Sequence, residues 1–403
     1  MPSTPRIHIL GLGNLGRLFA HALATLPNPP RITLLFHRPS LLDDWEAAGR
    51  QIQIASKDLS STSSSSNYTI EVIDSNSSTL GSSTLSPSQG PIQNLLITTK
   101  AQHTLRALIP LLPRLTKSST LLFAQNGLGT IDEVTAALFF NPSTRPKYLA
   151  AITSHGVYST GPFKSVHAGL ADVKVGPVYP RTEPQSQNAS AANSSPKPLE
   201  GTQNEHGAEA EQTAPLLNAL TSCPILTCTT VPAHTLKNLQ LEKLTINAIV
   251  NPLTAILGVK NGEILQHDSI RRVTHLLIEE CSRILVSLPE LQPTNSKTTT
   301  SSPSPGKKSP DDEMTLLERF SPTRLDTLVT TVAQKTAANT SSMLQDVQAG
   351  RETEIEYING YFVRRARETG IKCVFNEKIV GAVKGRVSVG VGELEGLFDG
   401  LGE

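Results

Sequence analysis

Short apolar runs alternate with helix-like segments along the first third of the chain. The strand-like runs are Arg6–Leu10, Arg31–Phe36, Asn94–Thr99 and Thr120–Ala124. Three-to-four residue apolar spacing covers residues 14–26, 103–115 and 130–138. Strands that alternate with helices are typical of a parallel sheet whose two faces are covered by helices. The pattern therefore predicts an α/β fold for the amino-terminal part.

The apolar pattern changes near Pro232. Beyond this point, amphipathic helical spacing covers residues 234–257, 269–288, 324–349 and 354–369. We therefore predict two domains, an α/β domain at residues 1–232 and an all-α domain at residues 233–403.

Three segments rich in Ser, Thr, Asn and Pro interrupt this pattern, near residues 56–90, 181–214 and 293–312. Such compositions bury too little apolar surface to offset the entropy that is lost on ordering. We therefore predict mobile surface loops in all three segments. Within the first of them, residues 68–73 alternate well enough to predict a short strand.

Composition and charge exclude several classes of protein. The 403 residues carry 36 Lys and Arg against 35 Asp and Glu, which gives no electrostatic basis for binding nucleic acid or an anionic membrane. No apolar stretch reaches the roughly 18 residues of a membrane span, and the start of the chain lacks a secretory pattern. The four scattered cysteines predict neither a disulfide framework nor a zinc site. We expect a cytoplasmic protein without a metal; a homodimer is compatible with these features.

A glycine-rich loop follows the first strand directly and opens the first helix. Its six residues are Gly11, Leu12, Gly13, Asn14, Leu15 and Gly16. The first glycine permits a tight turn, the second lets the backbone approach a pyrophosphate, and the third lets helix and strand pack closely. The free N–H groups at the helix start favour phosphate. This context predicts a Rossmann-type dinucleotide site, and the alternative is an ordinary turn.

The end of the second strand indicates which dinucleotide binds. A site for NAD usually has Asp or Glu there, which binds the ribose 2′-hydroxyl. This chain has Arg38, whose guanidinium can bind a 2′-phosphate through paired, charge-assisted hydrogen bonds. We therefore predict NADPH rather than NADH; the alternative is a solvated surface arginine. Lys100 and Asn126 end two further strands at the edge where ligands bind, and each is equally compatible with turn chemistry.

A polar row follows one side of the helix predicted at residues 234–257. Lys243, Asn247 and Asn251 are four residues apart, so their side chains project from one face. Because the neighbouring positions are mostly apolar, these groups are costly unless they meet polar partners. The candidate partners are a ligand, other polar groups of a core, or solvent. Pro252 predicts a kink or a break in the helix beside this row.

A second polar group begins with Ser342 and Asp346, again four residues apart. Thr353 and Glu356 have the spacing of a capping box, which predicts that Glu354 lies in the first turn of a helix. An acidic residue in a first turn often only complements the helix dipole.

Several segments in both domains resemble the ketopantoate reductase (2-dehydropantoate 2-reductase) family. They are the glycine loop, Lys100-Ala101, Gln125–Thr130, Val166–Gly169, residues 243–256, Ser341–Asp346 and Thr353–Gly360. These motifs occur in family order and span nearly the whole chain apart from the three polar segments. This chain departs from the family in one motif, which follows the strand-like run Asn94–Thr99. The family often has the sequence Lys-Ala-x-Gln at this position. Here Gln102 and His103 follow Lys100-Ala101, which leaves open which of the two contacts the cofactor.

The resemblance implies NADPH-dependent reduction of the ketone of 2-dehydropantoate to (R)-pantoate, a step toward pantothenate and coenzyme A. It implies that Lys243 is the general acid and that Glu354 assists it. It also implies that Arg38 and Lys100 contact the cofactor, and that the substrate is held by Asn126, Asn247, Asn251 and Ser342. The strand-end position makes Asn126 a candidate for cofactor binding as well. A protonated lysine suits this chemistry because negative charge grows on the ketone oxygen.

Two other functions stay open. One is the reduction of another branched 2-ketoacid, since the shape of a pocket is not readable from sequence. The other is a non-catalytic protein that senses NADPH, although a sensor has no use for the polar groups of the helical half. We interpret His155 and His167, which lie in family-like segments, as structural. The sequence leaves undecided the oligomeric state and the choice between cytosol and mitochondrion.

Overall fold

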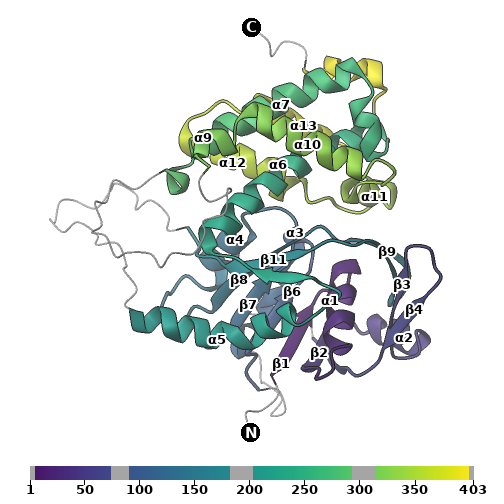
Figure 1. Ribbon diagram of the computed structural model, residues 1–403, viewed down its shortest axis with the longest axis vertical. Helices are drawn as coiled ribbons and strands as arrows, with labels where there is room; N and C mark the ends of the chain where they lie inside the picture. Colours follow the sequence, from purple (N-terminus) through teal and green to yellow (C-terminus); the bar gives the residue numbers. More distant parts are fainter. Residues whose placement is uncertain (1–4, 74–89, 182–202, 293–313, 399–403) are drawn as a thin grey trace, which may run out of the picture. The chain divides into compact units, whose positions relative to one another are not determined.

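The computed structural model describes residues 5–73, 90–181, 203–292 and 314–398 (Figure 1). The chain divides into two compact units. The first, called the α/β unit, runs to Gln125 and resumes at Thr130–Leu236. The second, called the helical unit, comprises Asn126–Gly129 and the chain from Lys237 onward.

This division differs from a single boundary near Pro232, because residues 126–129 belong to the helical unit. The backbone N–H of Leu128 donates to the carbonyl of Tyr357 over 2.8 Å. Gly127 adopts a φ of +78°, and a Cβ on it would lie 2.6 Å from the carbonyl oxygen of Tyr357. Only glycine permits this close approach.

The α/β unit is built on an eight-stranded sheet with the order β12-β11-β8-β7-β6-β1-β2-β5. Neighbouring strands are parallel except β11, which runs antiparallel to β8. The predicted α/β class is therefore confirmed, with a mostly parallel sheet. The strands are β1 (Arg6–Leu10), β2 (Arg31–Phe36), β5 (Thr69–Val72), β6 (Asn94–Ile97), β7 (Thr120–Phe123), β8 (Lys147–Thr153), β11 (Val173–Pro177) and β12 (Cys228–Thr230).

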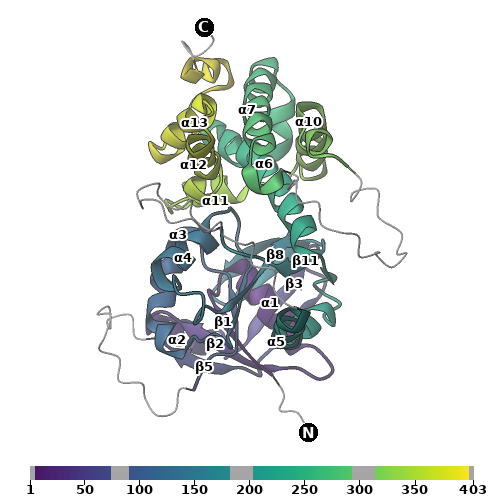
Figure 2. The same cartoon turned by 90° about the vertical axis from the view of Figure 1, so that its left-hand side faces the viewer.

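Helices cover both faces of this sheet, as Figure 2 shows. On one face, α1 (Asn14–Ala24) and α5 (Gln203–Thr221) pack with Ile7 and Ile9 of β1. On the other face, α3 (Ala101–Leu108), the 3-10 helix η1 (Ile109–Arg114) and α4 (Thr130–Leu138) pack with Leu10. Because successive strand residues point to opposite faces, burial of both faces requires continuous apolar runs such as those of β1 and β2.

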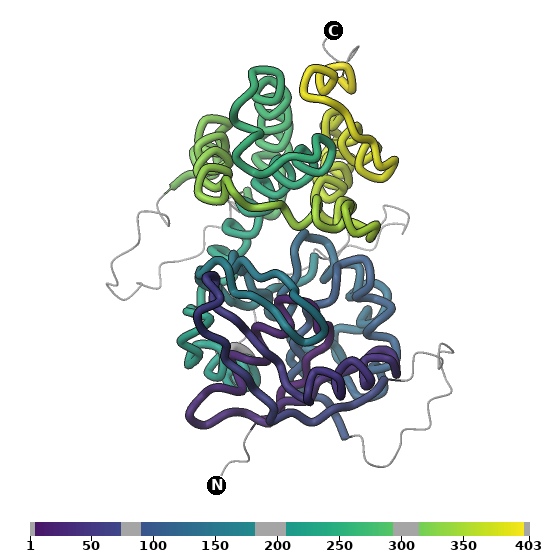
Figure 3. Tube along the Cα trace, turned by 90° about the vertical axis from the view of Figure 1, so that its right-hand side faces the viewer, coloured from purple at the N-terminus to yellow at the C-terminus, as the bar shows by residue number. Residues whose placement is uncertain are grey.

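A second, four-stranded sheet with the order β4-β3-β10-β9 lies in the same unit. Figure 3 shows its early strands, in purple, beside its later ones, in teal. The rings of Phe36, Trp45 and Phe163 pack together and join it to the main sheet. Its strands are β3 (Ile52–Ser56), β4 (Thr62–Ser65), β9 (Gly156–Gly161) and β10 (Lys164–Gly169), and Trp45 comes from α2 (Ser40–Ala47).

Two of the predicted mobile loops contain regular structure. Within residues 56–90, Thr62–Ser65 form β4, which pairs with β3, and the Ser65 hydroxyl lies 2.8 Å from the His21 ring. Within residues 181–214, α5 begins at Gln203 because its later turns bury Leu216 and Leu220. The loop prediction was wrong for these parts, while residues 74–89, 182–202 and 293–313 lie outside the described residues.

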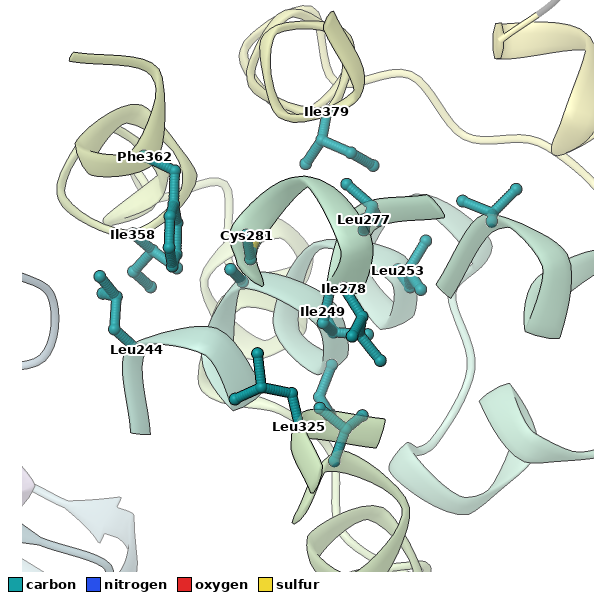
Figure 4. Close-up of a cluster of buried hydrophobic side chains, with 14 of the residues drawn as sticks. Leu244, Ile249, Leu253, Leu277, Ile278, Cys281, Leu325, Ile358, Phe362 and Ile379 are labelled. Atoms are coloured by element: carbon teal, nitrogen blue, oxygen red, sulfur yellow. The ribbon is translucent and has the colours of Figure 1, made fainter. Parts of the chain in front are cut away.

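The helical unit holds the predicted long helices around one apolar core. Figure 4 shows side chains that converge on it, among them Leu253, Leu277, Phe362 and Ile379, all fully buried. In the described parts of the chain, no helix is both long and apolar enough to cross a membrane. The helices are α6 (Ala233–Leu257), η2 (Asn261–Leu265), α7 (Asp268–Val286), η3 (Pro289–Leu291), α9 (Leu316–Arg319), α10 (Pro322–Lys335), α11 (Ser342–Gln348), η4 (Ile355–Tyr357), α12 (Asn359–Thr369), α13 (Val374–Lys384), η5 (Val391–Glu393) and η6 (Glu395–Phe398).

Two helix predictions need correction. The helix expected at residues 324–349 is divided into α10 and α11, because the Ser341 hydroxyl caps a new helix by accepting from the N–H of Leu344 over 3.1 Å. The capping box expected at Thr353 and Glu356 does not form, because Glu354 itself precedes the short helix η4 and α12 begins only at residue 359.

Pro252 does not break α6, and Asn251 stays helical, so the break that the sequence offered as one outcome is wrong, while a kink stays a prediction. Proline has no N–H, so the carbonyl of Ala248, four residues earlier, loses its helical partner. The Asn359 side chain replaces this partner, since its Nδ2 donates to the Ala248 carbonyl over 2.8 Å. A tertiary hydrogen bond thus allows the helix to continue.

We expect the free energy of unfolding of the α/β unit to decrease as the pH falls from about 6.5 to about 4. His8 and His21 are 2% and 1% exposed, and burial lowers the pKa of each to about 4. The unfolded chain therefore takes up these protons first, which costs the folded state up to about 3 kcal/mol per histidine. Denaturant unfolding at several pH values measures this effect. His8→Leu should remove the contribution of His8, up to about 3 kcal/mol over this pH range, and an unchanged dependence would contradict the assignment.

Candidate active site

The glycine loop forms an open cradle at the start of α1. Gly11 adopts a φ of +97°, and a Cβ on it would lie 2.5 Å from the backbone nitrogen of Thr99. A Cβ on Gly16 would collide with the carbonyl of Gly11, so glycine is needed for the close start of the helix. Gly13, in contrast, is exposed and has open space at its Cβ position.

The helix start is chemically suited to an anion. α1 has neither a capping side chain nor an acidic residue in its first turn. Its first N–H groups and the positive end of its dipole are therefore available to a negative ligand. The cradle around Gly13 fits the pyrophosphate of a dinucleotide.

Arg17 connects the glycine loop to the second sheet. Its Nε donates to the carbonyl of Leu12 over 3.0 Å. Its Nη1 donates to the carbonyls of Gly161 and Lys164, over 3.0 and 3.2 Å, at the turn between β9 and β10. The guanidinium also lies 5.6 Å from the centre of the Phe163 ring. Arg17 was not predicted from the sequence, because its acceptors Gly161 and Lys164 lie more than a hundred residues away along the chain.

The strand-end residues predicted to contact a cofactor lie on the carboxyl edge of the main sheet. His37 and Arg38 follow β2 directly, and both are exposed. Lys100 is the N-cap residue of α3, and its carbonyl accepts from the N–H of His103 over 2.9 Å. Although the side chain is exposed, partial desolvation of its ring, followed by the positive charges of Arg38 and His103, lowers the pKa of His37. Contacts of Arg38 and Lys100 with a cofactor stay predictions.

Three predicted site residues come together in the helical unit. The Nζ of Lys243 donates to the Oδ1 of Asn126 over 3.3 Å. Burial lowers the pKa of Lys243 to about 8, while the negative charge of Glu354 acts in the opposite direction. Glu354 is itself 5% exposed, and its carbonyl accepts from the N–H of Tyr357 over 3.0 Å.

The adjacent carboxylate on α6 is engaged elsewhere. Glu242 accepts from Arg319 over 2.6 Å and from Arg324 over 3.0 Å, in a buried cluster. Among the described acidic residues, Glu354 is thus the one whose charge acts on Lys243.

The other residues predicted to bind the substrate differ in how far they are exposed to solvent. Asn247 is half-buried and Asn251 is 8% exposed, one and two helical turns beyond Lys243. Neither side-chain amide is hydrogen-bonded to any residue that the structure describes. Ser342 is exposed at the start of α11, whereas Ser341 beside it is buried and accepts a hydrogen bond from Thr254 over 2.7 Å. The substrate-binding roles of Asn247, Asn251 and Ser342 stay predictions.

The two histidines interpreted as structural form a pair in the α/β unit. Nδ1 of His155 lies 2.9 Å from Nε2 of His167, and burial and His155 lower the pKa of His167. This pairing supports the structural interpretation. Within the described ranges, no group of three or more His, Cys, Asp or Glu residues is arranged to hold a metal ion.

Comparison with known families covers most of the chain. Residues 7–180 match the family model described as ketopantoate reductase PanE/ApbA, and residues 235–387 match the model of the C-terminal part of the same family. The ketoisovalerate reductase BEA2 of Gibberella fujikuroi is 32% identical over 95% of this chain and 83% of its own length. A probable 2-dehydropantoate 2-reductase of Schizosaccharomyces pombe is 29% identical over 95% of this chain and 97% of its own.

Solved structures show the same fold. A PanE/ApbA family ketopantoate reductase from Ralstonia eutropha matches with a TM-score of 0.65 and 19% identity, over 95% of this chain and 98% of its own. A ternary structure of D-mandelate dehydrogenase with NADH and anilino(oxo)acetate matches with a TM-score of 0.65 and 16% identity, with the same coverage.

A mostly parallel sheet with a glycine cradle, followed by a helical unit, defines a two-unit protein of the Rossmann class. The chain belongs to the ketopantoate reductase PanE/ApbA family, with both its N-terminal and its C-terminal part. It is therefore an NAD(P)-dependent reductase of this family.

Arg17→Met should weaken binding of NADP⁺ by about tenfold, because the carbonyl of Leu12 loses the donor that holds the glycine loop in place. Calorimetric titration with NADP⁺ measures this change. Arg31→Met, at the exposed start of β2, is the matched control and should bind normally. Equal affinity in both variants would rule out a positioning role for Arg17.

Proposed function

We propose that this protein reduces 2-dehydropantoate to (R)-pantoate with NADPH as the reductant. The single observation that carries the proposal is the half-buried Lys243, whose Nζ is hydrogen-bonded to Asn126 and whose charged form is favoured by Glu354. The glycine cradle of the α/β unit supports the choice of a dinucleotide. Arg38, in the place where an NAD site usually has a carboxylate, supports NADPH over NADH.

The glycine loop, with Arg38 and Lys100, would hold NADPH, and the bound cofactor would supply a hydride for the carbonyl carbon of the substrate. Lys243 transfers a proton from Nζ to the carbonyl oxygen, so a 2-hydroxyacid, oxidised cofactor and neutral lysine result. With a pKa of about 8, Lys243 is mostly protonated at neutral pH and still releases its proton more readily than an ordinary lysine. A proton from solvent then restores the ammonium group.

Glu354 and Asn126 keep Lys243 ready for this transfer. The Glu354 carboxylate favours the charged form of the lysine, which burial disfavours. The hydrogen bond to Asn126 Oδ1 fixes the direction of the ammonium group. Asn247, Asn251 and Ser342 are the proposed donors to the substrate, and the two amides lack partners among the described residues that would compete with it.

A second candidate substrate is 2-ketoisovalerate. The observation that favours it is the 32% identity with the ketoisovalerate reductase BEA2, against 29% with the probable 2-dehydropantoate 2-reductase. The two substrates share the 2-ketoacid group on which Lys243 acts, and 2-dehydropantoate carries an additional hydroxymethyl group on its branched carbon. The amides of Asn247 and Asn251 suit that hydroxyl, so we favour 2-dehydropantoate.

Initial rates of NADPH oxidation with each of the two ketoacids test the proposal. We expect a higher kcat/KM with 2-dehydropantoate. Lys243→Ala should lower turnover by about a hundredfold or more, with binding of NADP⁺ retained, and Lys378→Ala on the exposed face of α13 serves as the control. Preference for 2-ketoisovalerate would select the second candidate, and near-normal turnover of the Lys243 variant would refute the mechanism.

The rate of ketone reduction should fall as the pH rises through about 8, because Lys243 then loses the proton that it must donate. Glu354→Gln removes the charge that raises the lysine pKa, so the midpoint should move about one unit lower. The pH profile of kcat measures both effects. Glu356→Gln, whose carboxylate pairs with Lys384 at the surface, should leave the midpoint in place. If the midpoint is the same in the wild type and in both variants, Glu354 has no effect on the pKa of the proton donor.

A further inference from the structure

We propose that His37 and His103 join Arg38 in binding the 2′-phosphate of NADPH, and that this binding is coupled to the uptake of a proton. The inference rests on the proposed function, which supplies the cofactor, and it adds two residues that determine which cofactor is chosen. Of the two residues that follow Lys100-Ala101, the inference assigns the cofactor contact to His103 and not to Gln102.

The register of the main sheet places these residues around the glycine loop. Leu10, the last residue of β1, pairs with Leu35 of β2 on one side and with Ile97 of β6 on the other. Gly11 therefore leaves the sheet between the ends of these two strands. His37 lies directly beyond β2, and His103 lies in the first turn of α3, just beyond β6.

The charges around His37 are of one sign. Among the described residues, the charged groups that act on it are Arg38 beside it and His103 from α3. The carboxylates of α2, Asp43 and Asp44, are not among these groups, and Asp44 acts instead on Arg17. A guanidinium and two imidazoles without a carboxylate are complementary to a doubly charged anion and not to a ribose hydroxyl.

This arrangement couples phosphate binding to protonation. Desolvation of the ring, followed by the charges of Arg38 and His103, lowers the pKa of His37, which disfavours its imidazolium form in the free protein. A 2′-phosphate carries a charge of about −1.5 to −2 at pH 7. Its negative charge raises the pKa of His37 again, and the imidazole takes up a proton on binding. Affinity for a ligand with a 2′-phosphate should therefore increase as the pH falls from about 8 to about 6.5, whereas affinity for its analogue without this phosphate should not.

Titration calorimetry with 2′,5′-ADP and with 5′-AMP isolates the contribution of the 2′-phosphate without catalysis. Titrations in two buffers of different ionisation enthalpy give the number of protons taken up. We expect proton uptake with 2′,5′-ADP and none with 5′-AMP, and a ratio of the two affinities that is larger at about pH 6.5 than at about pH 8. In the double variant His37→Asn, His103→Asn, this ratio should fall about tenfold and the proton uptake should disappear, while affinity for 5′-AMP stays unchanged.

Two further variants complete the test. His275→Asn, at an exposed position of α7, is the matched control and should behave as the wild type. Arg38→Ala should lower the ratio while the proton uptake persists through His37. The inference is overturned if the double variant keeps both the affinity ratio and the proton uptake of the wild type. If neither nucleotide binds to the wild type and NADPH is not oxidised with either ketoacid, the proposed function fails first, and this inference fails with it.

Discussion

The arrangement of the helical unit depends on one energetically unfavourable feature. The ammonium group of Lys243 lies on α6, a helix whose neighbouring side chains pack in the apolar core. Leu241, Leu244 and Ala248, the neighbours of Lys243 on α6, are buried in the main apolar cluster. Burial favours the neutral amine, whereas Glu354 favours the ammonium ion. The balance brings the pKa of Lys243 to about 8. At this value the lysine is mostly protonated at neutral pH and can still release its proton. This balance is what a general acid at neutral pH requires.

The surrounding structure keeps these groups in place through hydrogen bonds between segments that are distant in sequence. The loop that carries Asn126 is fixed to the turn after Glu354 by the hydrogen bond from Leu128 to Tyr357. Asn359 connects the same turn to α6 at the carbonyl that Pro252 leaves without a partner, and it donates to Asn376 over 2.9 Å. Asn376 in turn donates to Glu280, which is fully buried. A proline that would ordinarily disrupt the helix thus supplies the attachment point for the segment that carries Glu354.

The sequence predicted the parts of the fold that local patterns encode. Apolar runs such as Arg31–Phe36 predicted strands because both faces of the main sheet are buried, and the spacing of Lys243, Asn247 and Asn251 predicted a row because helical geometry fixes it. The second sheet was missed because β4 consists of Thr and Ser, and its order comes from pairing with β3 and from contacts of Ser65 with His21. Continuation of α6 through Pro252 was missed for a similar reason, since the partner Asn359 is more than a hundred residues away. Arg17 belongs to the same class, because its acceptors in the β9–β10 turn are distant in sequence.

In this mechanism Lys243 is a charged lysine of lowered pKa, and its protonation depends on Glu354. Nuclear magnetic resonance of the side-chain amine, with ¹⁵N-labelled lysine and a Lys243→Arg variant for assignment, measures its pKa directly. We expect a pKa near 8 for the wild type and a lower value in Glu354→Gln. A pKa close to the ordinary lysine value of 10.5, unaffected by removal of the Glu354 charge, would contradict it.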